Sequence, residues 1–438
     1  MGRRKTSLER HERRHRYVHL GLAFGVVMIF SLVKWLAHDS IAMDWLRQQA
    51  FLAVHHWLRL GNDQIKPPPV VLVDISRVPR HAESAYPSNT PLAGLVRGKS
   101  FIDRRLLSNL IRRVAALQPV ALAIDVDLSP EFDGTEPPPY HLELLEDCRR
   151  LTIEGTPVFC GVGRSAGLEP AAWLAGSEYK EQAVLSLRFP GSNALMPSEI
   201  TRKRDGEKLL SISQRLADRY FAGRRSRPDI PAWLGWAVLP QREVRMPGVT
   251  ECTIRGFYVN YHFLNILTNE TLGWISAERV LSTEPGSPEE RSLAEKFKGR
   301  TVIFGDARMS ETFDVAGTPG QPEPIPGVYL HAAATCTLIS SPLSELKSFY
   351  GLVLSFLISA GFILLAQKIQ RQSKGRISSA AGELLINVFA IVGALGLAIV
   401  LAAWVHVLWL EVIAACVVFC GEFYAIILLS DIRWTRPV

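Results

Sequence analysis

Acidic side chains stand at the ends of several apolar runs, and these residues are the best placed to do chemistry. Asp74 closes VVLVD, Asp125 and Asp127 lie in AIDVD, and Asp306 follows TVIFG. If the runs are parallel strands, their carboxyl ends meet at one edge of the sheet, where open α/β sheets bind ligands. Converging carboxylates would favour a cation or an amine, or would share a proton. The alternative is that each caps a helix or bonds loop backbone.

Two familiar binding motifs also occur, but the residues around each of them argue against binding. HERRH at 11–15 has the spacing of a zinc-binding helix, but it lies in an arginine-rich arm where neighbouring cations oppose metal binding. GLVRGKS at 94–100 resembles a phosphate loop with one residue too few between its glycines, and no predicted strand precedes it. We therefore expect neither a metal nor a cofactor.

The segment GRSAG at 163–167 fits the nucleophile elbow of serine hydrolases, and it follows a predicted strand. Asp314 and His331 come later in the chain, in the order that such a triad would have. Pro170 delays the helix that an elbow needs, and no HGGG-like loop accompanies it. We expect no enzymatic activity, and a serine hydrolase or acyltransferase using Ser165 is the alternative.

The elements that would position these residues alternate between short apolar strands and helices. Strands are predicted at 70–76, 120–129, 156–163, 257–263 and 300–307, and helices at 44–60, 101–117, 141–151, 208–223 and within 326–340. Near-continuous aliphatic runs are typical of parallel strands that are covered on both faces. The order of elements predicts a three-layer α/β domain with a mostly parallel sheet.

Four apolar stretches are long enough to cross a bilayer, which takes about 18–22 residues. They lie at 17–37, 349–366, 384–405 and 408–430. A single helix through the last two would be roughly 70 Å long, against about 30 Å of hydrocarbon, so the chain must turn near Trp404–Glu411. The first stretch lacks a small-residue cleavage site and is predicted to be an uncleaved anchor.

Basic residues concentrate in three segments that four spans would place on one side of the membrane. These are the arm 1–16, the loop 367–383 and the tail 431–438, with Arg3, Arg4, Lys5, Arg10, Arg13, Arg14, Arg16, Lys368, Arg371, Lys374, Arg376, Arg433 and Arg436. The positive-inside rule puts both termini in the cytoplasm and residues 38–348 on the outer side of the membrane. Because the net charge of +7 resides in these segments, it does not indicate nucleic-acid binding.

Glu422 is an ionisable residue within the fourth apolar stretch. Such residues are costly in a membrane and often functional. Asn387 of the third stretch lies at a comparable depth, so the two side chains could meet and couple the helices. The alternatives are that Glu422 pairs with a polar residue of another protein, is held protonated, or extends to the membrane surface.

The six cysteines divide between the external region and the fourth stretch. Cys148, Cys160, Cys252 and Cys336 lie outside, and Cys416 and Cys420 lie in the stretch. An oxidising exterior would allow a disulfide between Cys148 and Cys160. The alternative is that they are buried free thiols.

Residues 70–350 resemble the CHASE type-2 (CHASE2) sensor domain, a bacterial extracytoplasmic module that usually has one span before it and three after it. The resemblance rests on ordered stretches: VVLVDIS (70–76), LLSNLIRRVAALQPVALAIDVDLSP (106–130), Asp133 and the helix at 141–151, PVFCGV (157–162), LLSISQRLADRYF (209–221), FYVNY (257–261), KGRTVIFGDARMSETFDVAGTP (298–319) and PGVYLHAAATCTLI (326–339). It implies that Asp125, Asp314 and His331 are family positions, without an established catalytic role. The family's W-P-W segment is replaced by LVRGKSF at 95–101, so a pocket built on those rings is not carried over.

The resemblance implies a multi-pass sensor of the bacterial plasma (inner) membrane, since such modules commonly feed cytoplasmic cyclase or kinase domains. The sequence ends at Val438, shortly after the last stretch, so we expect a separate cytoplasmic signalling or effector protein to read the signal. The other expected partners are the lipid bilayer and an unknown extracytoplasmic ligand, and a homodimer would suit signalling through helices. A scaffold that anchors another complex is a further alternative.

Overall fold

The chain forms two compact units in the computed structural model. The sheet unit comprises residues 61–228 and 241–342, and the helix unit comprises residues 1–60, 229–240 and 343–438. The structure describes residues 25–26, 28–29, 32, 47, 49–55, 67–82, 100–126, 128, 140–162, 179–185, 195–203, 206–222, 234–239, 241–244, 252–270, 272–307, 312–313, 325–372, 379–410, 412–413, 416–417 and 420.

A six-stranded parallel sheet forms the centre of the sheet unit, with the order β12-β1-β13-β4-β5-β6. Its strands are β1 (Val70–Asp74), β4 (Ala121–Asp125), β5 (Val158–Val162), β6 (Ala183–Leu185), β12 (Trp274–Ser276) and β13 (Thr301–Gly305). The four longest are buried along almost their whole length, which is why they read as continuous aliphatic runs. The predicted parallel sheet is confirmed.

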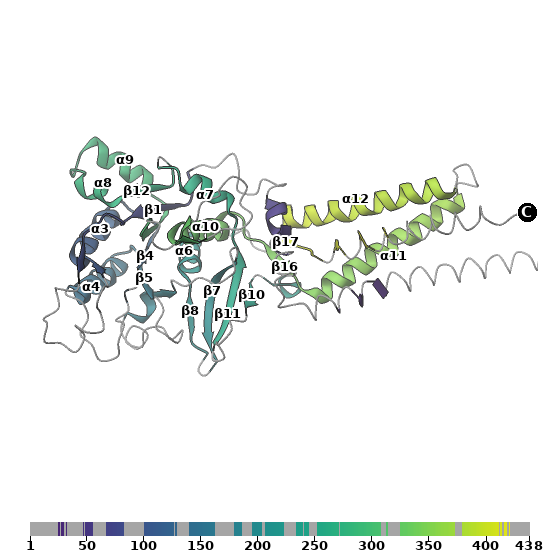
Figure 1. The fold of residues 1–438 in the computed structure, drawn as a ribbon, viewed down its shortest axis with the longest axis horizontal. Helices are drawn as coiled ribbons and strands as arrows, with labels where there is room; N and C mark the ends of the chain where they lie inside the picture. The colour runs from purple at the N-terminus through teal and green to yellow at the C-terminus, as the bar shows by residue number, and fades with distance from the viewer. Residues whose placement is uncertain are drawn as a thin grey trace, which may run out of the picture. The chain divides into compact units, whose positions relative to one another are not determined.

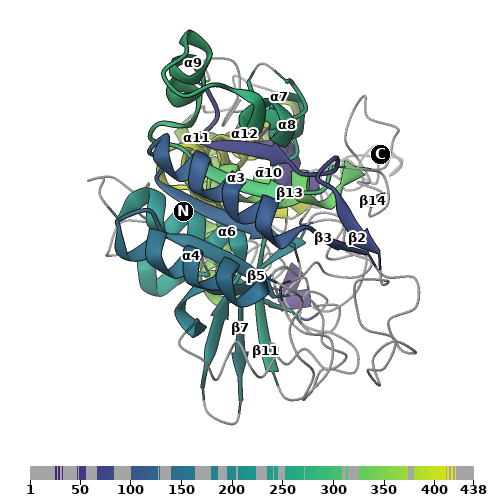
Figure 2. The same cartoon turned by 90° about the vertical axis from the view of Figure 1, so that its left-hand side faces the viewer.

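Helices cover both faces of this sheet, which gives the three predicted layers. One face carries α3 (Arg104–Ala116), α4 (His141–Ile153), α8 (Ala277–Ser282) and α9 (Pro288–Phe297). In Figure 2, α3 and α4 lie side by side in front of the strands. On the other face α10 (Gly327–Ser340) contacts β1 and β13, while α6 (Ile212–Phe221) and α7 (His262–Leu267) pack against α10.

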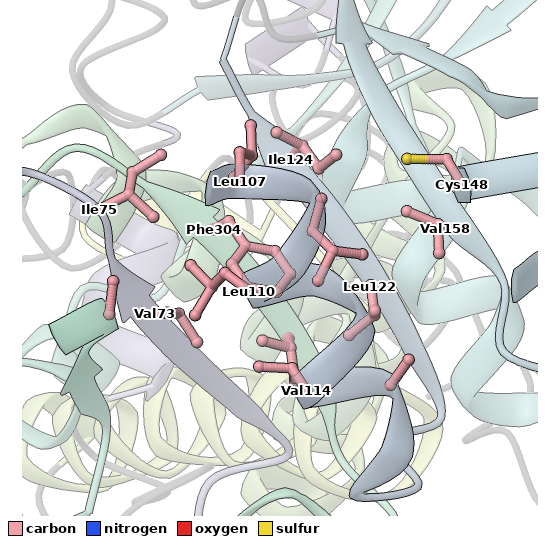
Figure 3. Close-up of a cluster of buried hydrophobic side chains, with 14 of the residues drawn as sticks. Val73, Ile75, Leu107, Leu110, Val114, Leu122, Ile124, Cys148, Val158 and Phe304 are labelled. Atoms are coloured by element: carbon pink, nitrogen blue, oxygen red, sulfur yellow. The ribbon is translucent and has the colours of Figure 1, made fainter. Parts of the chain in front are cut away.

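Helix α3 shows how the sequence builds this core. Asp103 caps it by accepting hydrogen bonds from the backbone N–H groups of Arg105 and Leu106, both at 2.9 Å. Leu107, Leu110, Ile111 and Val114 then recur at helical spacing, so they share one face and are fully buried against the strands. Figure 3 shows Leu107, Leu110 and Val114 among the core side chains. Burial of each such side chain stabilises the fold by about 1.5–3 kcal/mol.

A second, antiparallel sheet was not predicted. It has the order β10-β11-β7-β8 and consists of β7 (Leu195–Arg202), β8 (Lys208–Leu210), β10 (Arg242–Val244) and β11 (Cys252–Tyr258). The strand predicted at 257–263 is wrong in its second half, because the Asn260 side chain accepts a hydrogen bond from the N–H of His262, where α7 begins. The helix predicted at 208–223 begins only at Ile212, after the capping residue Ser211.

The helix unit contains two helices that are long and apolar enough to cross a membrane. These are α11 (Ser348–Gln372) and α12 (Ser379–Val405), which match the stretches predicted at 349–366 and 384–405. Figure 1 shows the two helices lying side by side. The stretches 17–37 and 408–430 fall largely outside the described residues, so the four-span architecture stays a prediction.

The remaining elements are short. A three-stranded sheet in the helix unit joins β9 (Val238–Leu239), β16 (Ser344–Leu346) and β17 (Val407–Leu408). The others are β2 (Arg80–Ala82), β3 (Ser100–Ile102), β14 (Thr312–Phe313), β15 (Ile325–Pro326), η3 (Lys180–Gln182) and η4 (Gly235–Ala237). All six cysteines are free thiols in the structure, and the Cys148 thiol contacts that of Cys160 in the core.

Candidate functional site

The candidate site lies at the carboxyl ends of three neighbouring strands. Asp74 of β1 and Asp125 of β4 both pair in register with Gly305 of β13, which runs between them. The helix before β4 covers one face of the sheet, whereas the chain after β13 leads to α10 on the other face. Such a change of face beside a central strand is where open α/β sheets bind ligands.

Asp74 fastens two loops together at this edge. Its carboxylate accepts hydrogen bonds from the N–H of Ser76 at 2.9 Å and from the Ser76 hydroxyl at 2.8 Å. A third comes from the N–H of Ala307, at 3.1 Å, in the loop after β13. These contacts match the alternative that a strand-end aspartate bonds loop backbone.

Asp306 makes a different contact. Its carboxylate forms an ion pair with Arg80 of β2, and both side chains are partly exposed. Arg80 precedes Asp306 by more than two hundred residues, so the pair joins β2 to the end of the central strand β13.

Asp125 faces a buried histidine of helix α10. The distance from His331 Nε2 to Asp125 Oδ1 is 3.7 Å, and the two side chains are 0% and 5% exposed. The carbonyl of His331 also accepts hydrogen bonds from the hydroxyls of Thr335 and Ser213, at 2.8 and 3.2 Å. This residue therefore links α10 to the sheet through its side chain and to α6 through its backbone.

A close approach beside this pair requires a glycine. A Cβ atom at Gly305 would lie 2.2 Å from Cγ2 of Val328, in the first turn of α10. Real side chains never tolerate such a distance, so the helix can begin against β13 only because residue 305 has no side chain. The first turn of α10 therefore packs directly against the candidate site.

Tyr329 belongs to the same site and was not singled out in the sequence. Burial, together with the negative charge of Asp74, raises the pKa of Tyr329 to about 12. The phenol therefore stays protonated at physiological pH. The sequence signal was its position in PGVYLH, two residues before His331.

A second pair that sequence reasoning missed lies at the first positions of α3 and α4. Burial, with a smaller contribution from the Arg104 charge, lowers the pKa of His141 from 6.5 to about 4. Arg104 and His141 are both buried. Arg104 and His141 are the first residues of two helices that the sequence predicted. That position at a helix start is the only feature of the sequence that could have pointed to them.

The structure thus brings four of the predicted residues to one edge of the sheet, namely Asp74, Asp125, Asp306 and His331. Each carboxylate there has its own contacts in the described part of the chain, so the edge is a set of links between elements. Asp127, Asp314, Ser165 and Glu422 lie outside the described residues, and for Asn387 only its helical backbone in α12 is described.

This arrangement can respond to a ligand by a change of conformation. Because Asp125 and His331 are buried together, neither meets solvent directly, and their interaction depends on how α10 sits on the sheet. A ligand or protein that displaces the loops held by Asp74 and Asp306 would act on that packing.

The chain matches a known protein family. The family described as the CHASE2 domain matches residues 22–366, which is most of the chain. Comparisons with curated proteins and with solved structures gave no match.

Proposed function

The chain belongs to the CHASE2 domain family, whose members are extracytoplasmic sensor domains of membrane proteins. From this premise we propose that it is a multi-pass, receptor-like subunit. Its sheet unit senses an extracytoplasmic ligand or protein, and its spanning helices pass the change to a separate cytoplasmic protein.

Helix α10 carries this proposal. Its residues 327–339 are all buried, it begins on Gly305 at the candidate site, and His331 ties it to Asp125. After Ser340 the chain passes through only β16 before it enters the apolar helix α11. A shift of α10 along the sheet therefore pulls directly on the chain that leads into that helix.

Any such signal needs a ligand that favours one position of α10 over another, since without differential affinity nothing is transmitted. A bound molecule gains that preference if it contacts loops whose position depends on α10. The Asp74 bonds to Ser76 and Ala307 place two such loops at the first turn of the helix.

The proposed topology has four spans, both termini in the cytoplasm and residues 38–348 outside a bacterial plasma membrane. Two observations support it: the apolar helices α11 and α12 match two predicted spans, and the residues between those spans are basic. On the same grounds we assign the bilayer as a partner and propose coupling between Glu422 and Asn387 within it.

The test of the signalling proposal is purification of the tagged full-length chain from its native membrane in mild detergent, followed by mass spectrometry. We expect a cytoplasmic signalling or effector protein in stoichiometric amount. Gly305→Ala, which forces Val328 off β13, should change the recovery or activity of that partner. Ser292→Ala, at an exposed position of α9, should not. Recovery of the chain alone, as monomer or homodimer, would contradict the proposal of a separate cytoplasmic partner.

We also propose that the chain is not itself an enzyme. A serine-reactive fluorophosphonate probe should label wild-type protein and the Ser165→Ala variant equally, at background level. Strong labelling that disappears in the variant would support the hydrolase or acyltransferase alternative instead.

A further inference from the structure

Aromatic side chains gather at one end of the two apolar helices of the helix unit. Phe349 and Tyr350 lie in the first turn of α11, and Trp404 lies in the last turn of α12. These two ends lie together, because β16, just before α11, pairs with β17, just after α12. Phe349 is 69% exposed and Trp404 is 84% exposed.

Trp236 joins this group from a distant part of the sequence. Residues 229–240 leave the sheet unit, contribute η4 and β9 to the helix unit, and return. β9 pairs antiparallel with β16, and the N–H of Lys347 donates to the carbonyl of Ala237 at 2.9 Å. The backbone beside Trp236 is thereby fixed to the start of α11.

The Trp236 ring is held at the helix end and still faces outward. It makes an edge contact with Tyr350, with ring centroids 4.5 Å apart, and the Lys347 ammonium donates to the Trp236 carbonyl at 2.6 Å. Despite these contacts Trp236 is 58% exposed. A tryptophan held at this exposure is costly in water, because most of its ring is apolar.

The exposed rings continue the apolar surfaces of the two helices. Large apolar side chains are exposed along α11 and α12, namely Val353, Leu357, Leu364, Leu365, Val388, Phe389, Val392, Leu395, Leu397 and Val400. Helices of this length with such surfaces suit the hydrocarbon core of a bilayer. The aromatic group stands where the apolar stretch of each helix ends, which is the level at which Trp and Tyr meet lipid headgroups.

We propose that Trp236, Phe349, Tyr350 and Trp404 form an interfacial surface that binds the headgroup region of a phospholipid leaflet. Residues 234–239 then give the sensor domain a membrane contact besides its spans. The occupant is lipid because the rings are continuous with the lipid-facing sides of α11 and α12 and lie beside the Lys347 ammonium, which is suited to a headgroup phosphate. The inference rests on the proposed insertion of those two helices.

The test places a benzophenone amino acid at single positions of the full-length chain in phosphatidylglycerol and phosphatidylcholine vesicles. After irradiation, phospholipid adducts are measured by mass spectrometry. We expect adducts at 236 and at 357 in α11, both several-fold above those at 153, an exposed position in the sheet unit. Adducts at 357 without adducts at 236, or protein crosslinks at 236, would overturn the inference and leave helix insertion standing.

Absence of adducts at both 236 and 357 would overturn helix insertion as well. Trp236→Phe, which keeps a ring against Tyr350, supplies an independent measurement if the benzophenone variant does not fold. Phospholipids brominated near the headgroup should quench a smaller fraction of the tryptophan fluorescence in this variant than in the wild type. An unchanged quenched fraction would contradict the lipid contact.

Discussion

The buried pair Asp125 and His331 offers the sharpest residue-scale prediction. His331→Ala removes a fully buried ring that faces a nearly inaccessible carboxylate, and truncation of a large buried side chain to alanine costs about 2–5 kcal/mol. Urea unfolding of the full-length chain in detergent, followed by circular dichroism, should show that loss. Ser340→Ala, at an exposed position of the same helix, is the control. A loss no larger than that of the control would show that the pair does not hold α10.

His141 predicts a pH dependence of stability. Its pKa falls from 6.5 to about 4 on folding, so below pH 6.5 the unfolded chain takes up a proton that the folded protein does not. The stabilisation is complete above pH 6.5 and is lost as the pH falls towards 4, by up to about 3 kcal/mol. Urea midpoints measured across this range should fall less steeply for His141→Leu than for the wild type. Parallel slopes would mean that His141 does not stay neutral in the fold.

The strand-end aspartates were predictable as a group, but their individual contacts were not. An apolar run that ends in Asp places the residue at the carboxyl edge, and the parallel sheet confirmed this for Asp74, Asp125 and Asp306. Which partner each one meets depends on elements that are distant in sequence, such as Arg80 for Asp306 and His331 for Asp125. The local sequence pattern carries no information about such distant pairs, which become visible only when the sheet topology and the burial of the side chains are known.

At the scale of elements, the contact of α10 with β13 predicts the effect of Gly305→Ala. The new Cβ would lie 2.2 Å from Cγ2 and 2.7 Å from Cβ of Val328, so strand and helix must separate at a cost of about 1–3 kcal/mol. Val328→Ala removes the closer atom, and the double variant should recover part of the loss, with a coupling of about 0.5–3 kcal/mol. Unfolding of all four proteins in urea measures it. If the losses in the free energy of unfolding are additive, the contact between residues 305 and 328 does not limit how α10 packs on β13.

The parallel sheet and the antiparallel sheet differ in how much the sequence reveals of them. β4 and β13 are buried on both faces and read as aliphatic runs, whereas β7 has the mixed sequence LMPSEITR. That strand is specified by its partner β11, where the Arg255 guanidinium lies 3.0 Å from the Glu199 carboxylate. Pairing of this kind depends on residues more than fifty positions away, so neither the alternation nor the charge pattern of β7 predicts it.

At the scale of the whole molecule, the distribution of charge predicts the topology. Lys368 and Arg371 lie near the end of α11, and Lys374 and Arg376 lie between α11 and α12 in the sequence. The segment Trp404–Glu411 has no Lys or Arg. A reporter enzyme that works only in the cytoplasm should therefore be active when inserted within 373–378 or fused after Val438, and inactive when inserted at 406–411. Activity within 373–378 together with inactivity after Val438 would mean that the stretch 408–430 does not cross. The cytoplasmic partner would then have to read α11 and α12 alone, and a role for Glu422 in coupling would fall with the fourth span.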